Sequence, residues 1–332
     1  MAETGTGDKI AVQVDGRSLT LTNLAKVLYP ADGFTKAEVL DYYQRISPVL
    51  LPHIADRPMT LRRYPHGVAD LSFFAKHAPA RHPDWLRTEV VVSHSSRART
   101  PGTPVSYLVI DDLPALIWAV NLAALELHVP MWRFASAGAD GPGDGVEPGD
   151  GAEPGGGTDP KVSPPPDLLV FDLDPGAPAT IVECCRVAEA LRPVLEADGL
   201  RPLPKTSGGK GLQLYAPLGG NSALSGKTAE QASELALAYA QRLERELPRL
   251  VVSRMTKSAR AGKVFIDWSQ NNESKTTVAP YSLRARDLPT VSTPVTWDEV
   301  AACRVVSDLT FTAPDVLARV EAHGDLFAPL VR

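Results

Sequence analysis

The sequence has few cysteines and no long apolar run, and each absence excludes a class of protein. Of its 332 residues only three are cysteines, with Cys184 and Cys185 adjacent and Cys303 far away. That spacing suits neither a disulfide framework nor a zinc site. No apolar run approaches the roughly 20 residues that span a bilayer, and the Met1–Lys9 segment has no hydrophobic signal region. We therefore expect a cytoplasmic protein with no membrane partner.

An excess of positive charge is also missing. The net charge is −5, which by itself argues against a nucleic-acid partner. However, residues 136–166 contain six acidic residues and one lysine, so the rest of the chain is neutral. Its basic residues are clustered, as in the group of Arg57, Arg62 and Arg63. Each cluster alone is typical of a solvated surface, but together they are consistent with a basic groove.

The acidic stretch 136–166 consists almost entirely of Gly, Pro, Asp, Glu, Ala and Ser. Such a composition buries too little apolar surface to offset the entropy lost on ordering, so we expect a disordered insert. The length of the chain allows one large domain or two medium ones. The insert is therefore either a linker between domains or an enlarged loop within one.

Three capping boxes predict where helices begin, at Thr35, Thr180 and Thr228. The apolar segment Val109–His128 is interpreted as a buried helix. Helical and strand-like patterns alternate without a regular repeat, which indicates an α+β fold with a mixed sheet. The strand-like runs are 89–93, 168–174, 212–216 and 264–268.

Carboxylates follow two of the apolar strands. Asp172 and Asp174 end the run 168–174 and, at i and i+2, project from one face of a strand. Two carboxylates this close repel each other, and a hard divalent cation such as Mg²⁺ or Mn²⁺ relieves that repulsion. Asp267 ends a second apolar strand and supplies the third carboxylate of a site for two metal ions.

Other interpretations of these aspartates remain open. They can simply end a strand at a turn, because short motifs have a high rate of false positives. An apolar strand followed by Asp-x-Asp also resembles the haloacid dehalogenase phosphatases, in which Asp172 would be the nucleophile. Pro175 and Gly176 follow here, where that family usually has Thr or Val, so this alternative ranks second.

A glycine-rich turn, Lys205–Gly211, precedes the strand 212–216. A Walker loop and a dinucleotide fingerprint both need a strand before the glycines and a helix after them, so neither fits. The remaining chemical use is a turn that binds a triphosphate through backbone N–H groups, Ser207 and Lys210. An ordinary surface loop is the alternative. The nearby carboxylates favour phosphate binding.

Taken together, these residues resemble the polymerase domain of bacterial DNA ligase D, a branch of the archaeo-eukaryotic primase superfamily. The resemblance implies one primase-like catalytic domain over 1–332, with a mixed or antiparallel central sheet flanked by helices and the insert 136–166 within it. The matching segments are 21–30, 33–36, 72–77, 121–128, 171–175, 205–212, 264–269 and 279–284.

The resemblance also implies roles for individual residues. Asp172, Asp174 and Asp267 would be catalytic and hold two Mn²⁺ or Mg²⁺ ions. Lys36 would lie in the first turn of a capped helix, where free N–H groups favour an anion. The ordinary alternative for Lys36 is a solvent-exposed lysine with no ligand. The ordinary alternative for Phe73 and Phe74 is a pair of core residues. The implied nucleotide-binding residues are His128, Ser207, Lys210, Gln213, Arg260, Gln270 and Arg284; those for the DNA 5′-phosphate are Asn23, Lys26 and Lys36; those for the template are Arg62, Arg63, Phe73 and Phe74.

The implied activity is template-dependent nucleotide transfer that fills gaps or ends in non-homologous end joining, with ribonucleotides preferred. DNA with gaps or broken ends, a 5′-phosphate, NTP or dNTP, the Ku protein and a separate ligase are the expected partners of a stand-alone, nucleoid-associated enzyme. Gln213 departs from the family, which usually has His there. A catalytically weak scaffold that binds DNA ends is a further alternative.

Overall fold

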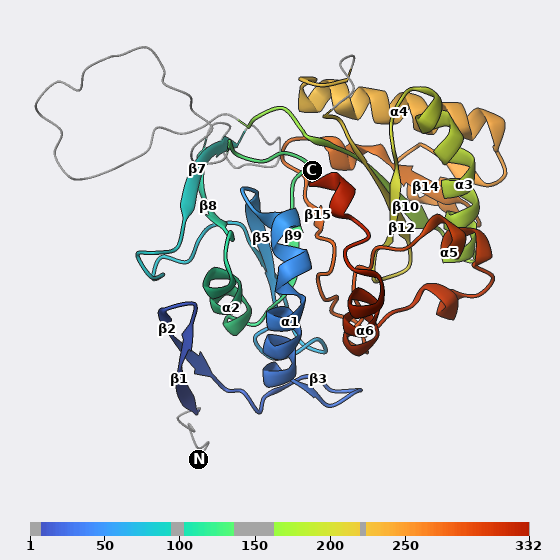
Figure 1. Ribbon diagram of the computed structural model, residues 1–332. Helices are drawn as coiled ribbons and strands as arrows, with labels where there is room; N and C mark the ends of the chain where they lie inside the picture. Colours follow the sequence, from blue (N-terminus) through green and yellow to red (C-terminus); the bar gives the residue numbers. More distant parts are fainter. Residues whose placement is uncertain (1–7, 94–102, 136–162, 220–223, 332) are drawn as a thin grey trace, which may run out of the picture.

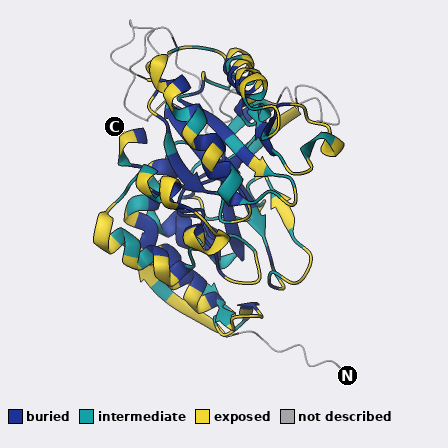
Figure 2. Cartoon of the chain, turned by 90° about the vertical axis from the view of Figure 1, so that its right-hand side faces the viewer, coloured by how far each residue is buried: buried dark blue, intermediate teal, exposed yellow. Residues whose placement is uncertain are grey.

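The computed structural model describes residues 8–93, 103–135, 163–219 and 224–331. Two β-sheets lie side by side, with α1 and α2 on the first and α3, α4 and α5 around the second (Figure 1). The strands form the buried centre, and the exposed residues lie mostly on the outer faces of the helices (Figure 2). The expected α+β architecture is confirmed.

The first sheet has the order β15-β9-β5-β8-β7, with β6 paired to β5, and all of its pairings are antiparallel. Helices α1 and α2 share its apolar core. Two small hairpins, β1-β2 and β3-β4, precede α1 and complete this half. The elements are β1 Lys9–Val14, β2 Arg17–Thr22, β3 Val27–Tyr29, β4 Phe34–Thr35, α1 Lys36–Ile54, β5 Pro58–Arg63, β6 Phe73–Ala75, β7 Thr88–Ser93, β8 Thr103–Val109, α2 Leu113–Asn121, β9 Ala124–Val129, β15 Thr277–Val278 and α6 Ala313–His323.

The second sheet has the order β11-β12-β10-β14-β13. Strands β13 and β14 are parallel and the other pairs are antiparallel, so this sheet is mixed, as expected. Helices α3 and α4 share a second apolar core with it. The elements are β10 Leu168–Pro175, α3 Ile181–Ala197, β11 Leu203–Thr206, β12 Leu212–Pro217, α4 Ala229–Glu246, β13 Val251–Val252, β14 Val264–Asp267 and α5 Trp297–Ala302, with short 3₁₀ turns η1 Lys257–Arg260, η2 Trp268–Asn271, η3 Val306–Leu309 and η4 Ala328–Leu330.

The side chains of strand β10 alternate between the two faces of the sheet, and its two aspartates both lie on one of them. Because side chains alternate along a strand, Leu169, Phe171 and Leu173 enter the core shared with α3 and α4. Leu168 and Val170 occupy the opposite face, against Met131 and Tyr215. By the same alternation Asp172 and Asp174 lie on that opposite face, away from the helices.

The capping signals predicted the helix starts correctly. Thr35, Thr180 and Thr228 each cap a helix through a complete capping box. The expected helix over 109–128 is wrong, since only Leu113–Asn121 is helical and β9 follows. The chain reverses through Ala123, whose φ is +59°. A segment that is buried on every side shows no periodicity that distinguishes a helix from a strand.

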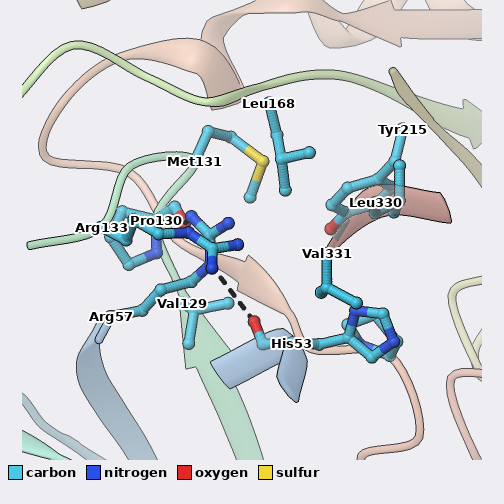
Figure 3. Close-up of a pocket in the computed structure, with 11 residues that line it drawn as sticks. His53, Arg57, Val129, Pro130, Met131, Arg133, Leu168, Tyr215, Leu330 and Val331 are labelled. Atoms are coloured by element: carbon cyan, nitrogen blue, oxygen red, sulfur yellow. Dashed lines mark hydrogen bonds between the residues drawn. The ribbon is translucent and has the colours of Figure 1, made fainter. Parts of the chain in front are cut away.

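Arg57 does not belong to a basic surface, contrary to the sequence-based grouping. Its side chain is 1% exposed and forms a two-point contact with Asp167, at 2.6 and 2.8 Å. Figure 3 shows Arg57 beside Arg133 on one wall of a cavity of about 10 Å³. That volume is about the minimum for one water molecule. None of the residues expected to form the functional site lines this cavity.

The expected insert, 136–166, lies outside the described residues except for its last four positions. Its interpretation and the single-domain assignment therefore stay predictions. Across the described segments, no helix is both long and apolar enough to cross a membrane.

Candidate active site

Four polar residues form a row across the second sheet, one from each of four neighbouring strands. Lys205 on β11 is paired with Gln213 on β12, Gln213 with Asp172 on β10, and Asp172 with Asp267 on β14. Directly opposed residues of antiparallel strands project from the same face. The Gln213 side-chain amide donates a hydrogen bond to Asp172 Oδ1 at 3.0 Å. The strand register thus brings together the aspartates that the sequence places almost 100 positions apart.

The carboxylates of Asp172 and of the neighbouring Asp174 favour a bound cation. Burial and then the neighbouring charge of Asp174 raise the pKa of Asp172 to about 7. Burial, followed by the charge of Asp267, also raises the pKa of Asp174. A divalent ion would compensate both effects, and carboxylate oxygens are the ligands that Mg²⁺ and Mn²⁺ prefer. The donor set therefore fits such ions.

Asp267 is held partly aside from the other two aspartates. Its oxygens accept hydrogen bonds from the Ser269 backbone and hydroxyl groups and from Gln270 Nε2, the last at 2.9 Å. Within the described ranges, no three acidic, imidazole or thiol groups already converge as a metal cluster. The Oδ2 atom of Asp267 accepts only the Gln270 bond among these three, so it keeps a lone-pair site for a metal ion. The expected sugar contact of Gln270 competes with the same bond.

A pocket of about 330 Å³ lies beside the aspartates. Asp172, Asp174 and Gln213 contribute to its lining, and cationic side chains supply much of the rest. Negative ligands are attracted to such a concentration of cations, and carboxylates beside them can hold an accompanying metal. The pocket is therefore suited to a polyphosphate. Its cationic residues are Lys210, Arg260, Arg284 and Arg286.

The glycine-rich turn shapes one wall of this pocket. The Ser207 hydroxyl accepts hydrogen bonds from the backbone N–H groups of Gly209 and Gly211, at 3.2 and 3.1 Å. A Cβ atom at Gly211 would lie 2.3 Å from the Leu173 carbonyl oxygen, so only glycine lets the turn approach β10. Lys210 is exposed at the tip of the turn. Ser207 thus folds the turn, and Lys210 is directed to solvent and the pocket.

Glu126 is a buried anion around which several expected site residues gather. It accepts a hydrogen bond from His128 Nε2 at 2.9 Å and lies 3.4 Å from Arg284 Nε and 3.5 Å from Arg62 Nη1. Burial alone would raise the pKa of Glu126, but the His128 hydrogen bond and the Arg284 charge hold it at about 2. Burial lowers the pKa of His128, although Glu126 opposes that shift.

Phe73 and Phe74 are exposed on β6, with 47% and 58% of their surface accessible, so they are not core residues. The Arg63 guanidinium lies 5.2 Å from the Phe73 ring centre, and that of Arg62 lies 5.2 Å from Phe74. The edge of Phe74 also meets His128, with ring centres 5.6 Å apart. Exposed rings beside arginines are suited to stacking bases and binding phosphate.

Comparison with known proteins identifies the family. The model of the LigD primase-polymerase domain matches residues 35–327. This chain belongs to that family. Over 310 residues it is 45% identical to the multifunctional non-homologous end joining protein LigD of Mycolicibacterium smegmatis, covering 93% of this chain and 36% of that protein. It is 29% identical to the bifunctional LigD of Bacillus subtilis over 314 residues, 95% of this chain and 44% of that protein.

A solved structure of the same family supports the fold. The polymerase domain of Mycobacterium tuberculosis ligase D, in complex with DNA, matches with a TM-score of 0.80 and 44% identity. The match covers 94% of this chain and 98% of that one. The chain spans only a little over a third of the length of the mycobacterial relatives that it matches.

The three residues expected at a DNA 5′-phosphate lie together in the first half of this primase-polymerase fold. Asn23 is exposed, with φ +53°, and its carbonyl accepts the Lys26 backbone N–H. Lys36 begins α1, but its ammonium is buried and donates to Thr22 and Asn121. Burial and then the charge of Lys26 lower the pKa of Lys36 to about 8. An anion would relieve this repulsion.

Sequence reasoning missed three residues of the site: Lys205, Glu126 and Arg286. Lys205 is completely buried, and burial lowers its pKa well below its usual value even though Asp172 opposes the shift. Glu126 lies two positions before His128, a spacing that puts both on one face of a strand. A helix over 109–128 would put these two residues on different faces, so only the strand brings them together. Arg286 follows Arg284 at the same spacing.

Proposed function

We propose that this chain is a template-dependent nucleotidyltransferase, a DNA repair polymerase or primase that fills gaps or ends in non-homologous end joining. The observation that carries the proposal is the pair Asp172 and Asp174, which lines a pocket with four cationic side chains, with Asp267 directly opposite Asp172 on the next strand. Carboxylates for metal ions beside cations for a triphosphate are what nucleotide transfer requires. The family match supports the same activity.

In this proposal the primer 3′-hydroxyl oxygen attacks the α-phosphorus, and pyrophosphate leaves. Two Mn²⁺ or Mg²⁺ ions, held by Asp172, Asp174 and Asp267, would supply stabilisation of the attacking and leaving oxygens. Lys210, Arg260, Arg284 and Arg286 would bind the phosphates and neutralise the charge that develops on the leaving pyrophosphate. Ser207 shapes the turn that carries Lys210, and Gln213 orients Asp172.

Template and nucleotide would meet next to Glu126. Phe73 and Phe74 would stack on template bases while Arg62 and Arg63 bind its phosphates, because the rings are exposed beneath those guanidinium groups. His128 contacts Phe74, so in this proposal it would lie between the template and the incoming nucleotide. We further propose that ribonucleotides are preferred over deoxynucleotides, with His128 and Gln270 reading the sugar.

The DNA end would be recognised by its 5′-phosphate, at Asn23, Lys26 and Lys36. Each lost phosphate contact removes one released counterion from the binding equilibrium. The LigD relatives are named as non-homologous end joining proteins. Cooperation with Ku and with DNA ligase activity is proposed from that resemblance.

Primer extension tests this function. The substrate is a gapped duplex with a downstream 5′-phosphate, supplied with Mn²⁺ and each NTP and dNTP separately. Wild-type protein is expected to extend the primer according to the template, and Asp174→Asn to bind the duplex without extending it. Glu230→Asn, an exposed substitution on α4, serves as the matched control.

The rival functions give different results in the same assay. A phosphatase with an Asp172 nucleophile would release phosphate without a template, and Asp172→Ala would abolish that release. An end-binding scaffold would bind the gapped duplex but never extend it. Neither alternative gains support from the family comparisons. Failure of wild-type protein to extend any primer with Mn²⁺ would refute the proposed polymerase.

A further inference from the structure

Lys205 is a lysine with no exposed surface, located on the same face of the sheet as Asp172 and two strands away from it. Its side-chain nitrogen donates hydrogen bonds to two neutral groups, Gln213 Oε1 and Ser292 Oγ. The centre of the Tyr215 ring lies 5.3 Å from the same nitrogen. Burial of a charged amine is costly unless the amine is paired and hydrogen-bonded, and both of these hydrogen-bond partners are neutral. Packing alone therefore does not account for this residue.

The donor and the acceptor of each hydrogen bond around Lys205 can be assigned in only one way. The Ser292 hydroxyl donates to the Thr206 carbonyl at 3.0 Å, so it must accept from Lys205. Lys205 likewise only donates to Gln213, which puts the amide oxygen of Gln213 toward the lysine. The amide nitrogen is then directed to Asp172, to which it donates at 3.0 Å. Lys205 thereby fixes which end of the Gln213 amide meets the carboxylate.

We propose that Lys205 is a positioning residue of the active site, which acts through Gln213 to hold the Asp172 carboxylate in the orientation that binds a divalent cation. The three residues are directly paired on β11, β12 and β10, so the chain of bonds crosses the sheet in one line. An amide whose oxygen accepts from Lys205 is polarised and becomes a stronger donor at its other end. This inference rests on the proposed metal-dependent function.

A role through Gln213 differs measurably from a purely structural one. If Lys205 acts only by anchoring Gln213, removal of either residue has the same consequence for Asp172. Removal of both then has little further effect, because coupled residues are not additive. If Lys205 instead supports the sheet independently, the two effects on metal binding multiply. Loss of a group that orients a metal ligand typically weakens metal affinity by about 10- to 100-fold.

The test measures Mn²⁺ binding without nucleotide or DNA, by the disappearance of the electron paramagnetic resonance signal of free Mn²⁺. It compares wild type, Lys205→Met, Gln213→Leu and the double variant. Methionine matches the lysine stem and removes only the polar end, so folding is expected to be retained. Thr293→Val is the matched control, because its buried hydroxyl donates to the Val291 carbonyl and not to this chain of bonds. Thermal unfolding is recorded for every variant.

We expect Lys205→Met and Gln213→Leu each to weaken Mn²⁺ binding about tenfold, the double variant to match the single ones, and Thr293→Val to bind like wild type. In primer extension, kcat should fall in Lys205→Met with little change in nucleotide KM. Two results would overturn the positioning role but leave the proposed polymerase function standing. One is wild-type Mn²⁺ affinity in a folded Lys205→Met variant, and the other is Mn²⁺ binding weakened about 100-fold in the double variant.

Two further outcomes also decide the matter. If wild type binds no Mn²⁺, the proposed metal site is wrong, and the inference is rejected with it. If Lys205→Met yields no folded protein, Ser292→Ala takes its place, because it removes the other anchor of Lys205 together with the bond to the Thr206 carbonyl. Severalfold weaker Mn²⁺ binding in Ser292→Ala would then support the role, and unchanged binding would overturn it.

Discussion

Replacing Glu126 with Gln tests whether the buried anion holds the nucleotide side of the site together. The side chain is 1% exposed and faces His128, Arg284 and Arg62. Its pKa of about 2, against an ordinary value of 4.5, is a shift that corresponds to about 3 kcal/mol of stability at neutral pH. We therefore expect Glu126→Gln to lower the free energy of unfolding at pH 7 by about that amount.

The pH dependence gives the sharper test. Because the folded-state pKa of Glu126 is depressed, its contribution is fully present above about pH 4.5 and is lost as the pH falls toward 2. The difference between wild type and Glu126→Gln should therefore narrow by about 1.4 kcal/mol between pH 7 and pH 3.5. Urea unfolding at the two pH values measures it, with exposed Glu321→Gln as the control. A difference that stays constant over this range would refute the argument.

Three further predictions concern the substrates. Lys26→Ala should remove the preference for a gap with a 5′-phosphate and lower the slope of log affinity against log salt by roughly 0.7–0.9, measured by fluorescence anisotropy; equal slopes would contradict the phosphate contact. Phe74→Ala should weaken binding of the template strand by about 1–3 kcal/mol, whereas Leu71→Ala, at another exposed apolar residue, should not, and equal losses would argue against stacking. Gln270→Ala should reduce the ratio of ribonucleotide to deoxynucleotide incorporation by up to about tenfold, and an unchanged ratio in competition assays would exclude Gln270 as a reader of the sugar.

Local signals in the sequence predicted much of the fold. The capping boxes at Thr35, Thr180 and Thr228 act within four residues, so they can be read without knowledge of tertiary structure. The 109–128 segment failed for the opposite reason. Its burial comes from packing on all sides. The turn at Ala123 depends on a positive φ angle, which an alanine in the sequence does not indicate.

Prediction of the site from the sequence was limited in the same way. Asp172, Asp174 and Asp267 could be proposed as metal ligands because each follows an apolar run at the end of a strand. The roles of Lys205 and Glu126 depend on the neighbouring strand, and a one-residue change of register would direct their side chains to the other face. Pairing of Lys205 with Gln213, or of Arg62 with Glu126, is known only once the sheets are assembled.

The ion pair between Arg133 and Asp167, at 2.7 Å, joins two residues that flank the 136–162 segment. Since Arg57 holds the same carboxylate, the two ends of that segment leave and re-enter the fold at one fixed point. The entropy of closing a chain between fixed ends grows only with the logarithm of its length, by about 0.6 kcal/mol for each doubling. A change in the number of residues between Arg133 and Asp167 therefore carries a small entropic cost, while the aspartates five and seven residues after Asp167 on β10 keep their places.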